Sequence, residues 1–278
     1  MKSLYDDLSQ QVSRITTKKY STSFSLGIMA LRPSIRPAIY AIYGYVRLAD
    51  EIVDSFHEFN KRELLERFRR QTFEALDERI SINPILNSFQ EAVRRYGIGR
   101  DLIIQFLKSM EMDLDPLSYD SRLYDEYILG SAEVVGLMCL HVFTEGDKDS
   151  YHKLKPYAMK LGSAFQKVNF LRDLNHDYSQ LGRTYFPGLD LAAFDHQYKN
   201  SIEREIASEF EEALVGIRLL PPSSRFGVYL ACRYYFSLLR KIRRIPAEKL
   251  LDGRVRINNA GKITVMVRSY VRFKFASI

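Results

Sequence analysis

The chain has 278 residues, of which 46% are hydrophobic and 27% charged, and this composition argues against disordered, collagen-like and disulfide-stapled classes of protein. Its two cysteines, Cys139 and Cys232, form no zinc-binding pattern, and we expect both thiols to be reduced and buried. The net charge is +7, but residues 221–278 carry a local net charge of +11, so residues 1–220 carry −4.

Helical periodicity dominates the chain. The first residues, MKSLYDDLSQQ, contain early acids and no apolar core, so we do not expect a signal peptide. Apolar residues at three- and four-residue steps predict helices at 39–49, 64–73, 84–96, 99–112, 123–143, 150–178, 200–218 and 225–244, with breaks near 79–83, 116–121, 145–149 and 181–198. No long stretch alternates with period 2, and no apolar run approaches the 18 or so residues of a membrane-spanning helix. We therefore predict one all-α domain over residues 1–278, folded as a helical bundle.

Two aspartates lie on one face of the helix predicted around residues 39–54. In AIYAIYGYVRLADEIVD, Asp50 and Asp54 are four residues apart, so both side chains project from the same face, one turn apart. Arg47 and Tyr43 extend that face backwards. The four residues form a polar stripe on an otherwise hydrophobic helix.

A second stripe of the same kind occurs in LGSAFQKVNFLRDLNHD. Gln166, Asn169, Asp173 and Asp177 are spaced by three, four and four residues, again on one helix face. Like charges four residues apart repel, and burying them is costly unless cations compensate. Mg²⁺ resolves both problems, because it prefers oxygen ligands and combines one or two carboxylates with the oxygens of a substrate phosphate. Two facing stripes therefore predict a Mg²⁺ and diphosphate site with arginines at its edge. The alternative is that each pair lies on a solvated helix face and has this spacing by accident. Two such pairs in one chain argue against this alternative more strongly than one pair would.

Several segments resemble the squalene/phytoene synthase family along almost the whole chain. They are YSTSFS (20–25), YGYVRLADEIVD (43–54), SMEMDLD (109–115), YILGSAEVVGLM (127–138), GSAFQKVNFLRDLNHDYSQLGRTYFP (162–187), YYFSLLRKI and GRVRI. The resemblance implies the all-α isoprenoid synthase bundle with a central active-site cavity. This agrees with the helical bundle predicted from periodicity.

The resemblance also implies roles for individual residues. The first aspartate-rich motif of the family binds Mg²⁺ and falls on Asp50 and Asp54; the second falls on Asp173 and Asp177, with Asn169 as an additional metal ligand. Substrate-binding roles are implied for Tyr20, Ser21, Ser23, Tyr43, Arg47, Tyr127, Gln166, Arg172, Tyr235 and Arg254, and Tyr43 and Tyr235 join the four aspartates as catalytic residues. Two positions depart from the pattern: His176 stands where an acid is common, and Tyr20 stands where some relatives carry histidine.

The implied reaction is a Mg²⁺-dependent head-to-head condensation of two identical allylic diphosphates through a cyclopropyl diphosphate, with Mn²⁺ as a substitute metal and no NADPH. We expect two geranylgeranyl diphosphates as the substrates, in carotenoid biosynthesis. Condensation of two farnesyl diphosphates to squalene or dehydrosqualene is one alternative, and a non-catalytic assembly or binding protein is another. The retained aspartates speak against the last.

The basic end of the chain predicts an anionic partner. We do not expect nucleic acid, because a nucleic-acid binder would leave the acidic stripes unexplained. Between Arg254 and Phe275, basic residues interleave with apolar ones, a pattern typical of a segment at a membrane surface. We expect a cytoplasmic protein and hypothesise reversible peripheral binding at the inner face of the cell membrane. The alternative is that the apolar half of this segment packs on the bundle.

Overall fold

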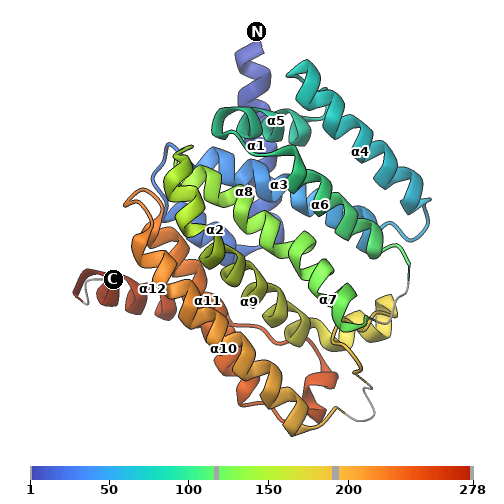
Figure 1. Cartoon of the computed structure of the whole chain (residues 1–278), viewed down its shortest axis with the longest axis vertical. Helices are drawn as coiled ribbons and strands as arrows, with labels where there is room; N and C mark the ends of the chain where they lie inside the picture. The colour runs from blue at the N-terminus through green and yellow to red at the C-terminus, as the bar shows by residue number, and fades with distance from the viewer. Residues whose placement is uncertain (1, 116–118, 190–193, 276–278) are drawn as a thin grey trace.

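The computed structural model describes residues 2–115, 119–189 and 194–275 as an all-α bundle, without a β-strand in these ranges (Figure 1). The first half contains α1 (Lys2–Tyr20), α2 (Thr22–Met29), α3 (Arg36–Asp54), α4 (Lys61–Glu78), α5 (Pro84–Tyr96) and α6 (Arg100–Met112). The second half contains α7 (Ser121–Ile128), the π-helical turn η1 (Leu129–Glu133), α8 (Val134–Phe143), α9 (Lys148–Leu181), α10 (His196–Leu219), α11 (Arg225–Arg243), the 3-10 helix η3 (Glu248–Asp252) and α12 (Asn259–Phe275). The predicted fold class is confirmed.

Polar caps begin the helices at the predicted breaks. The side chain of Asn83 accepts hydrogen bonds from the first amides of α5, with Pro84 at the first helical position. Asp120, Asp147 and Asp195 cap α7, α9 and α10 in the same way. Sequence-local capping therefore explains where these helices begin.

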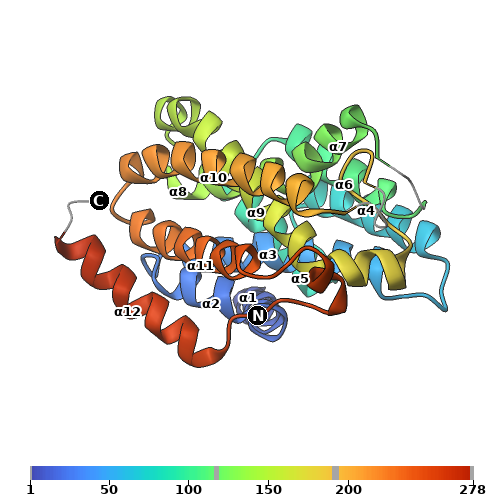
Figure 2. The same cartoon turned by 90° about the horizontal axis from the view of Figure 1, so that it is seen from below.

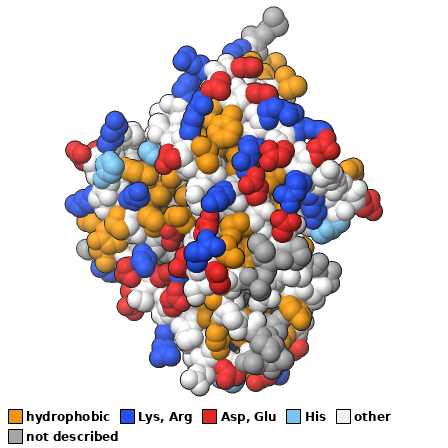
Figure 3. All heavy atoms as spheres, turned by 45° about the vertical axis from the view of Figure 1, so that its right-hand side comes forward, with side chains coloured by type: hydrophobic (Ala, Val, Ile, Leu, Met, Phe, Trp, Pro, Cys, Tyr) orange, Lys and Arg blue, Asp and Glu red, His pale blue; other side chains and the backbone are white. Residues whose placement is uncertain are grey.

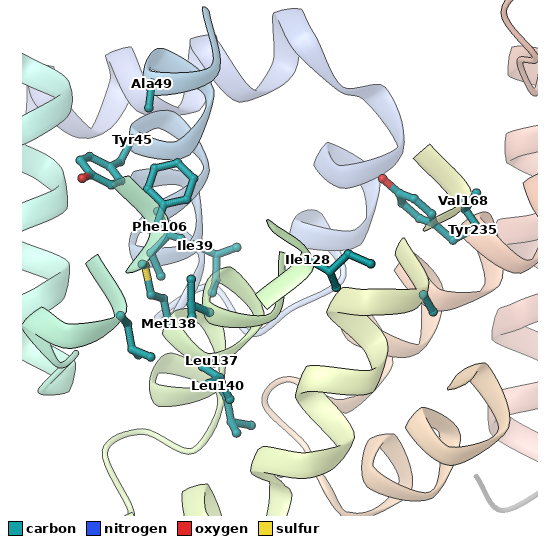
Figure 4. Packing of buried hydrophobic residues seen from close by; sticks show 14 of the residues in the cluster. Ile39, Tyr45, Ala49, Phe106, Ile128, Leu137, Met138, Leu140, Val168 and Tyr235 are labelled. Carbon is teal, nitrogen blue, oxygen red and sulfur yellow. The ribbon is translucent and has the colours of Figure 1, made fainter. Parts of the chain in front are cut away.

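The long helix α9 lies between α8, α10 and α11, and α3 lies on the other side of the bundle against α1, α4 and α5 (Figures 1 and 2). Buried side chains of α3, α6 and α8 fill the space between the two groups (Figure 4). At their centre the ring of Tyr45 stacks on that of Phe89, with centroids 3.8 Å apart. On the outside, charges of both signs are interspersed over the face shown in Figure 3.

Three helices, α1, α2 and α12, were missed by the sequence analysis because small or hydroxyl residues make up most of their buried faces. The fully buried residues of α1 are Ser9, Ser13 and Thr17. The hydroxyls of Ser9 and Thr17 donate to backbone carbonyls of α1, and the Ser13 hydroxyl shares a hydrogen bond with that of Ser88 on α5. Small hydroxyl residues let α1 approach α3 closely, so that a Cβ on Gly44 would lie only 3.1 Å from the Ser13 hydroxyl. The buried residue of α12 is likewise a serine, Ser269.

The helical segment 121–143 has the length and composition of a membrane span, with a mean hydropathy of 1.4 over its most apolar window. This differs from the expectation that no apolar segment reaches such a length. The segment is nevertheless packed against α3, α6 and α9 in the middle of the bundle, which is the position of a core helix. Its π-helical turn directs Ser131 and Ala132 to the wall of an internal cavity.

The contact between α9 and α10 predicts a stability effect at Gly216. A Cβ on this residue would lie 2.2 Å from the Cβ of Tyr157, so Gly216→Ala should lower the free energy of unfolding by about 1–3 kcal/mol, measured by urea denaturation. Gly27→Ala is the matched control, because its Cβ would lie 3.4 Å from that of Ala231, an ordinary contact, and helix propensity then favours alanine. Equal effects of the two substitutions would contradict this account of the helix crossing.

Candidate active site

The polar stripe of α3 carries its own counterion. Arg47 forms ion pairs with Asp50 and with Glu51, one turn further along the same helix. Its guanidinium also lies over the ring of Tyr20, 4.3 Å from the centroid, which joins the end of α1 to α3. Tyr20, one of the two departures from the family pattern, thus contacts a predicted diphosphate-binding arginine.

The polar stripe of α9 is held by two arginines. Arg172 pairs with Asp173, and Arg254, from the segment that follows η3, places its Nε 2.7 Å from Asp173 Oδ1. Deeper along the same face, the Tyr235 hydroxyl of α11 donates to Asn169 Oδ1 at 3.3 Å. Residues 66 and 81 positions apart in the chain therefore meet around one turn of α9.

A buried arginine that the sequence analysis did not single out connects the first aspartate motif to Asp113, at the end of α6. Gly182 ends α9 in the left-handed conformation (φ +65°), and the chain turns back so that Arg183 enters the protein. Arg183 Nη1 lies 2.7 Å from Asp54 Oδ1 and 3.5 Å from Asp113 Oδ1. The hydroxyls of Tyr127 and Tyr185 donate to the two carboxylate oxygens of Asp113 at 2.7 and 2.9 Å.

The missed residues had weak signals in the sequence. Asp113 and Arg183 lie inside two segments that carry the family resemblance, SMEMDLD and QLGRTYFP. Neither shares a helix face with the aspartate stripes, so spacing along one helix could not connect them. Ser131 is a further case: its hydroxyl lines the cavity, is buried, and has no hydrogen-bond partner among the described residues.

A cavity of about 390 Å³ opens between α3 and α9 and continues into the bundle. Its size is within the usual range for small-molecule sites. Predicted site residues on its wall are Tyr20, Ser21, Tyr43, Arg47, Asp50, Tyr127, Gln166, Asn169, Arg172, Tyr235 and Arg254. The other end is lined by apolar side chains that include Leu154, Ile217 and Leu220. The cavity is therefore polar at one end and hydrocarbon-like at the other.

The remaining predicted residues lie off the cavity wall. Asp173 pairs with two residues of the wall, Arg172 and Arg254. Asp54 pairs with the buried Arg183, and Asp177 lies one turn beyond Asp173 on the same helix. Ser23, on the first turn of α2, is not among the residues that line the cavity. Its substrate-binding role stays a prediction.

Aromatic rings separate the polar end of the cavity from the apolar end. Phe165 stacks on Tyr235 with centroids 4.0 Å apart, and Phe24 lies edge-on to both rings. Phe24 also contacts Tyr43, at 5.4 Å between centroids. Burial raises the pKa of Tyr43 to about 12, so its hydroxyl stays neutral. Such faces can stabilise a cation, and they keep water from it.

The buried carboxylates repel one another. Burial, together with the nearby charges of Asp173 and Asp54, raises the pKa of Asp177 to about 8. Burial raises the pKa of Asp113 to about 6 against the opposing effect of Arg183. The pKa of Asp50 is raised by burial and by Asp54, although 35% of its side chain remains exposed.

These raised pKa values show that the arginines do not fully compensate the acids, and a divalent cation with oxygen ligands fits this deficit. Among the described residues, however, no three carboxylate, histidine or cysteine side chains already converge as a metal site. Arginines hold Asp50, Asp54 and Asp173 individually, and His176 Nδ1 lies 3.9 Å from Asp177 Oδ1. The metal-ligand roles stay predictions.

The fold is that of the isoprenoid synthases. The crystal structure of a dehydrosqualene synthase in complex with a ligand superposes with a TM-score of 0.85, covering 97% of this chain and 98% of the other, at 22% sequence identity. The structure of squalene synthase HpnC from Alicyclobacillus acidocaldarius superposes with a TM-score of 0.74 at 20% identity, over 85% of this chain and 93% of that one.

The chain belongs to the squalene/phytoene synthase family, whose sequence profile matches residues 17–260. It is similar to 4,4'-diapophytoene synthase of Staphylococcus haemolyticus, at 27% identity over 82% of this chain and 85% of the relative. It is equally similar to phytoene synthase of Arthrospira platensis, at 27% identity over 85% and 84% of the two chains. Enzymes of this family are metal-dependent prenyltransferases that join two prenyl diphosphates head to head.

The pKa of Asp177 predicts how metal binding depends on pH. Because that pKa is raised, the folded protein keeps a proton that the unfolded chain releases, so this group's contribution to metal-free stability falls as the pH rises from about 4 to 8. A metal competes with the proton, so Mg²⁺ should raise the thermal midpoint more at pH 8 than at pH 6. Scanning fluorimetry measures this, with Asp177→Asn as the control that should lose most of the pH dependence. Equal Mg²⁺ shifts at the two pH values in the wild type would contradict the metal-ligand role.

Proposed function

We propose that the protein is a 15-cis-phytoene synthase, which condenses two geranylgeranyl diphosphates in carotenoid biosynthesis. Family membership supports the reaction class, and the length of the cavity supports the twenty-carbon substrate. Family membership does not distinguish the two substrates, so the choice of geranylgeranyl diphosphate rests on the length of the cavity.

Helix α9 provides a scale for that length. One of its faces lines the cavity from Arg172 at the polar end to Leu154 at the apolar end, a distance of about 27 Å at 1.5 Å per residue. A chain of 16 main-chain carbons with bonds of about 1.5 Å spans at most about 20 Å, and the 12-carbon main chain of a farnesyl group about 14 Å. The cavity accommodates the longer chain with its diphosphate held near Arg172.

The residues at the polar end have complementary roles in this proposal. Arg47, Arg172 and Arg254 bind the diphosphate groups as they do the aspartates in the structure, since guanidinium matches both anions. Asp50, Asp54, Asn169, Asp173 and Asp177 would hold Mg²⁺, which when bound would neutralise the departing diphosphate. Gln166 and Tyr127 complete the polar wall.

The aromatic layer has the next role. Tyr43, Tyr235 and Phe165 present ring faces where an allylic cation would form after the first diphosphate leaves. The double bond of the second substrate then attacks that cation, and loss of a proton closes the ring to give a cyclopropylcarbinyl diphosphate. A second ionisation, rearrangement and loss of a second proton give the triene. No reductant is needed, so the proposal excludes a requirement for NADPH.

A second candidate function is supported by the relatives. Diapophytoene synthase and a dehydrosqualene synthase are among the proteins to which the chain is similar, so a synthase acting on two farnesyl diphosphates is the alternative. The two candidates share the polar end and differ in how deep a substrate must fit.

Product analysis tests the choice. Purified protein with geranylgeranyl diphosphate and Mg²⁺, without NADPH, should release diphosphate and form phytoene; activity should vanish with EDTA and return with Mg²⁺ or Mn²⁺. Asp50→Asn and Asp173→Asn should each reduce turnover to below about a tenth of wild type, a barrier increase of at least roughly 1.4 kcal/mol. A thirty-carbon product from farnesyl diphosphate, with no forty-carbon product, would assign the alternative function.

Substrate length should be sensitive to substitution of Leu161. This residue lines the cavity about 17 Å along α9 from Arg172, beyond the reach of a farnesyl chain but within that of a geranylgeranyl chain. Leu161→Phe should therefore lower kcat/KM for the twenty-carbon substrate about tenfold or more and spare the fifteen-carbon one. Met159→Phe, on the same helix but off the cavity wall, is the control for nonspecific damage. An unchanged substrate ratio in Leu161→Phe would overturn the length argument.

A further inference from the structure

Helix α12 exposes an apolar stripe that faces away from the bundle. Ile263, Val267, Val271 and Phe275 follow one another at four-residue steps and are 56%, 53%, 49% and 86% exposed. Figure 2 shows α12 as the outermost helix on its side of the molecule, lying along α11. The sequence analysis also considered that the apolar half of this segment packs on the bundle. These four side chains do not pack there, because they are exposed.

The inner face of α12 fixes its orientation. Ser269 is buried, and the ring of Phe273 lies 5.0 Å from that of Phe226 and 5.8 Å from that of Tyr229, both on α11. The hydroxyl of Tyr234 donates to the backbone carbonyl of Lys262 at 3.2 Å. The helix therefore has a packed inner face, and rotating the exposed stripe inward would break these contacts.

Basic residues border the stripe. Arg268 and Arg272 follow Val267 and Val271 directly and are exposed, and Lys274 precedes Phe275. The sequence of α12 contains no Asp or Glu. A row of apolar side chains bordered by cations is the pattern of a helix that lies in the plane of a membrane interface.

We propose that α12 binds peripherally to the surface of an anionic phospholipid bilayer, with the apolar stripe inserted at the headgroup boundary and the cations against lipid phosphates. Charge complementarity favours this occupant over a second copy of the chain, because two α12 helices would bring like charges together. It is favoured over nucleic acid because the outward residues of the stripe are apolar and not cationic. The proposal does not rest on the identity of the substrate.

The position of α12 relates this surface to the cavity. Helix α11 contacts α12 through Phe226 and Tyr229, while Gly227, Val228 and Ala231 of the same helix line the apolar end of the cavity. One helix thus separates the proposed membrane face from the apolar interior.

Vesicle binding by the full chain tests the proposal. Wild type should sediment with vesicles of phosphatidylcholine and phosphatidylglycerol in about 0.1 M salt and dissociate in about 1 M salt, because the screening length falls from about 10 to 3 Å. It should bind far less to pure phosphatidylcholine. The triple variant Arg268→Gln, Arg272→Gln, Lys274→Gln should partition roughly a hundredfold less, since each cation contributes about a fivefold increase.

A fluorescence experiment places the contact on the stripe. The chain has no tryptophan, so a single Val267→Trp substitution reports only on α12, and its emission should shift to the blue when anionic vesicles are added. Leu8→Trp is the matched control, because Leu8 is a half-exposed apolar residue of α1 (50%), and its emission should not shift. Because both substitutions are at exposed positions, circular dichroism should show the wild-type fold.

Four outcomes would overturn the proposal. Two are equal sedimentation of wild type and the triple variant, and a blue shift at Leu8→Trp but not at Val267→Trp. A third is a Val267→Trp shift that appears without lipid as the protein concentration rises, which would assign the stripe to self-association. The fourth is binding of the wild type to random-sequence DNA in place of vesicles, which would assign the surface to nucleic acid.

Discussion

The polar end of the cavity depends on keeping several buried carboxylates next to one another. Burial and mutual repulsion raise the pKa values of Asp50, Asp113 and Asp177, which is the energetic cost of gathering acids in a low-dielectric interior. Arginines offset part of it, and Arg183 does so for two acids from different helices. These ion pairs join α3, which lines the cavity through Asp50, to the end of α6 and to the chain beyond α9.

The rest of the bundle keeps the helices close while leaving space inside. At several crossings a glycine meets the backbone or a small side chain of the next helix: Gly162 faces the carbonyl of Ala132, Gly136 that of Ala158, and Gly27 packs on Ala231. These three glycines also lie on the cavity wall. Small residues therefore have two effects here. They allow close helix crossings, and they leave volume for a substrate that larger side chains would fill.

Local patterns in the sequence predicted the helical fold and both polar stripes, because helix faces and caps are determined by residues three or four positions apart. Both stripes, Tyr43 to Asp54 and Gln166 to Asp177, were predicted on this basis. The structure places Tyr43, Arg47 and Asp50 of the first stripe and Gln166 and Asn169 of the second on the wall of one cavity. The analysis missed α1, whose buried face is Ser9, Ser13 and Thr17, because hydroxyl residues do not register as an apolar face. It also missed the pairing of Arg183 with Asp113, since that contact spans 70 positions and no helix face relates the two.

The division of α9 into a polar half near Arg172 and an apolar half near Leu154 has an evolutionary consequence. In the proposed function, the residues that bind the diphosphate and those that limit the length of the prenyl chain lie on this one helix, several turns apart. Substitutions at distant, independent sites tend to have additive effects. A lineage can therefore change the carbon number of its substrate by altering the apolar half while its chemistry stays intact. Such separable inheritance suits a family whose members include both diapophytoene and phytoene synthases.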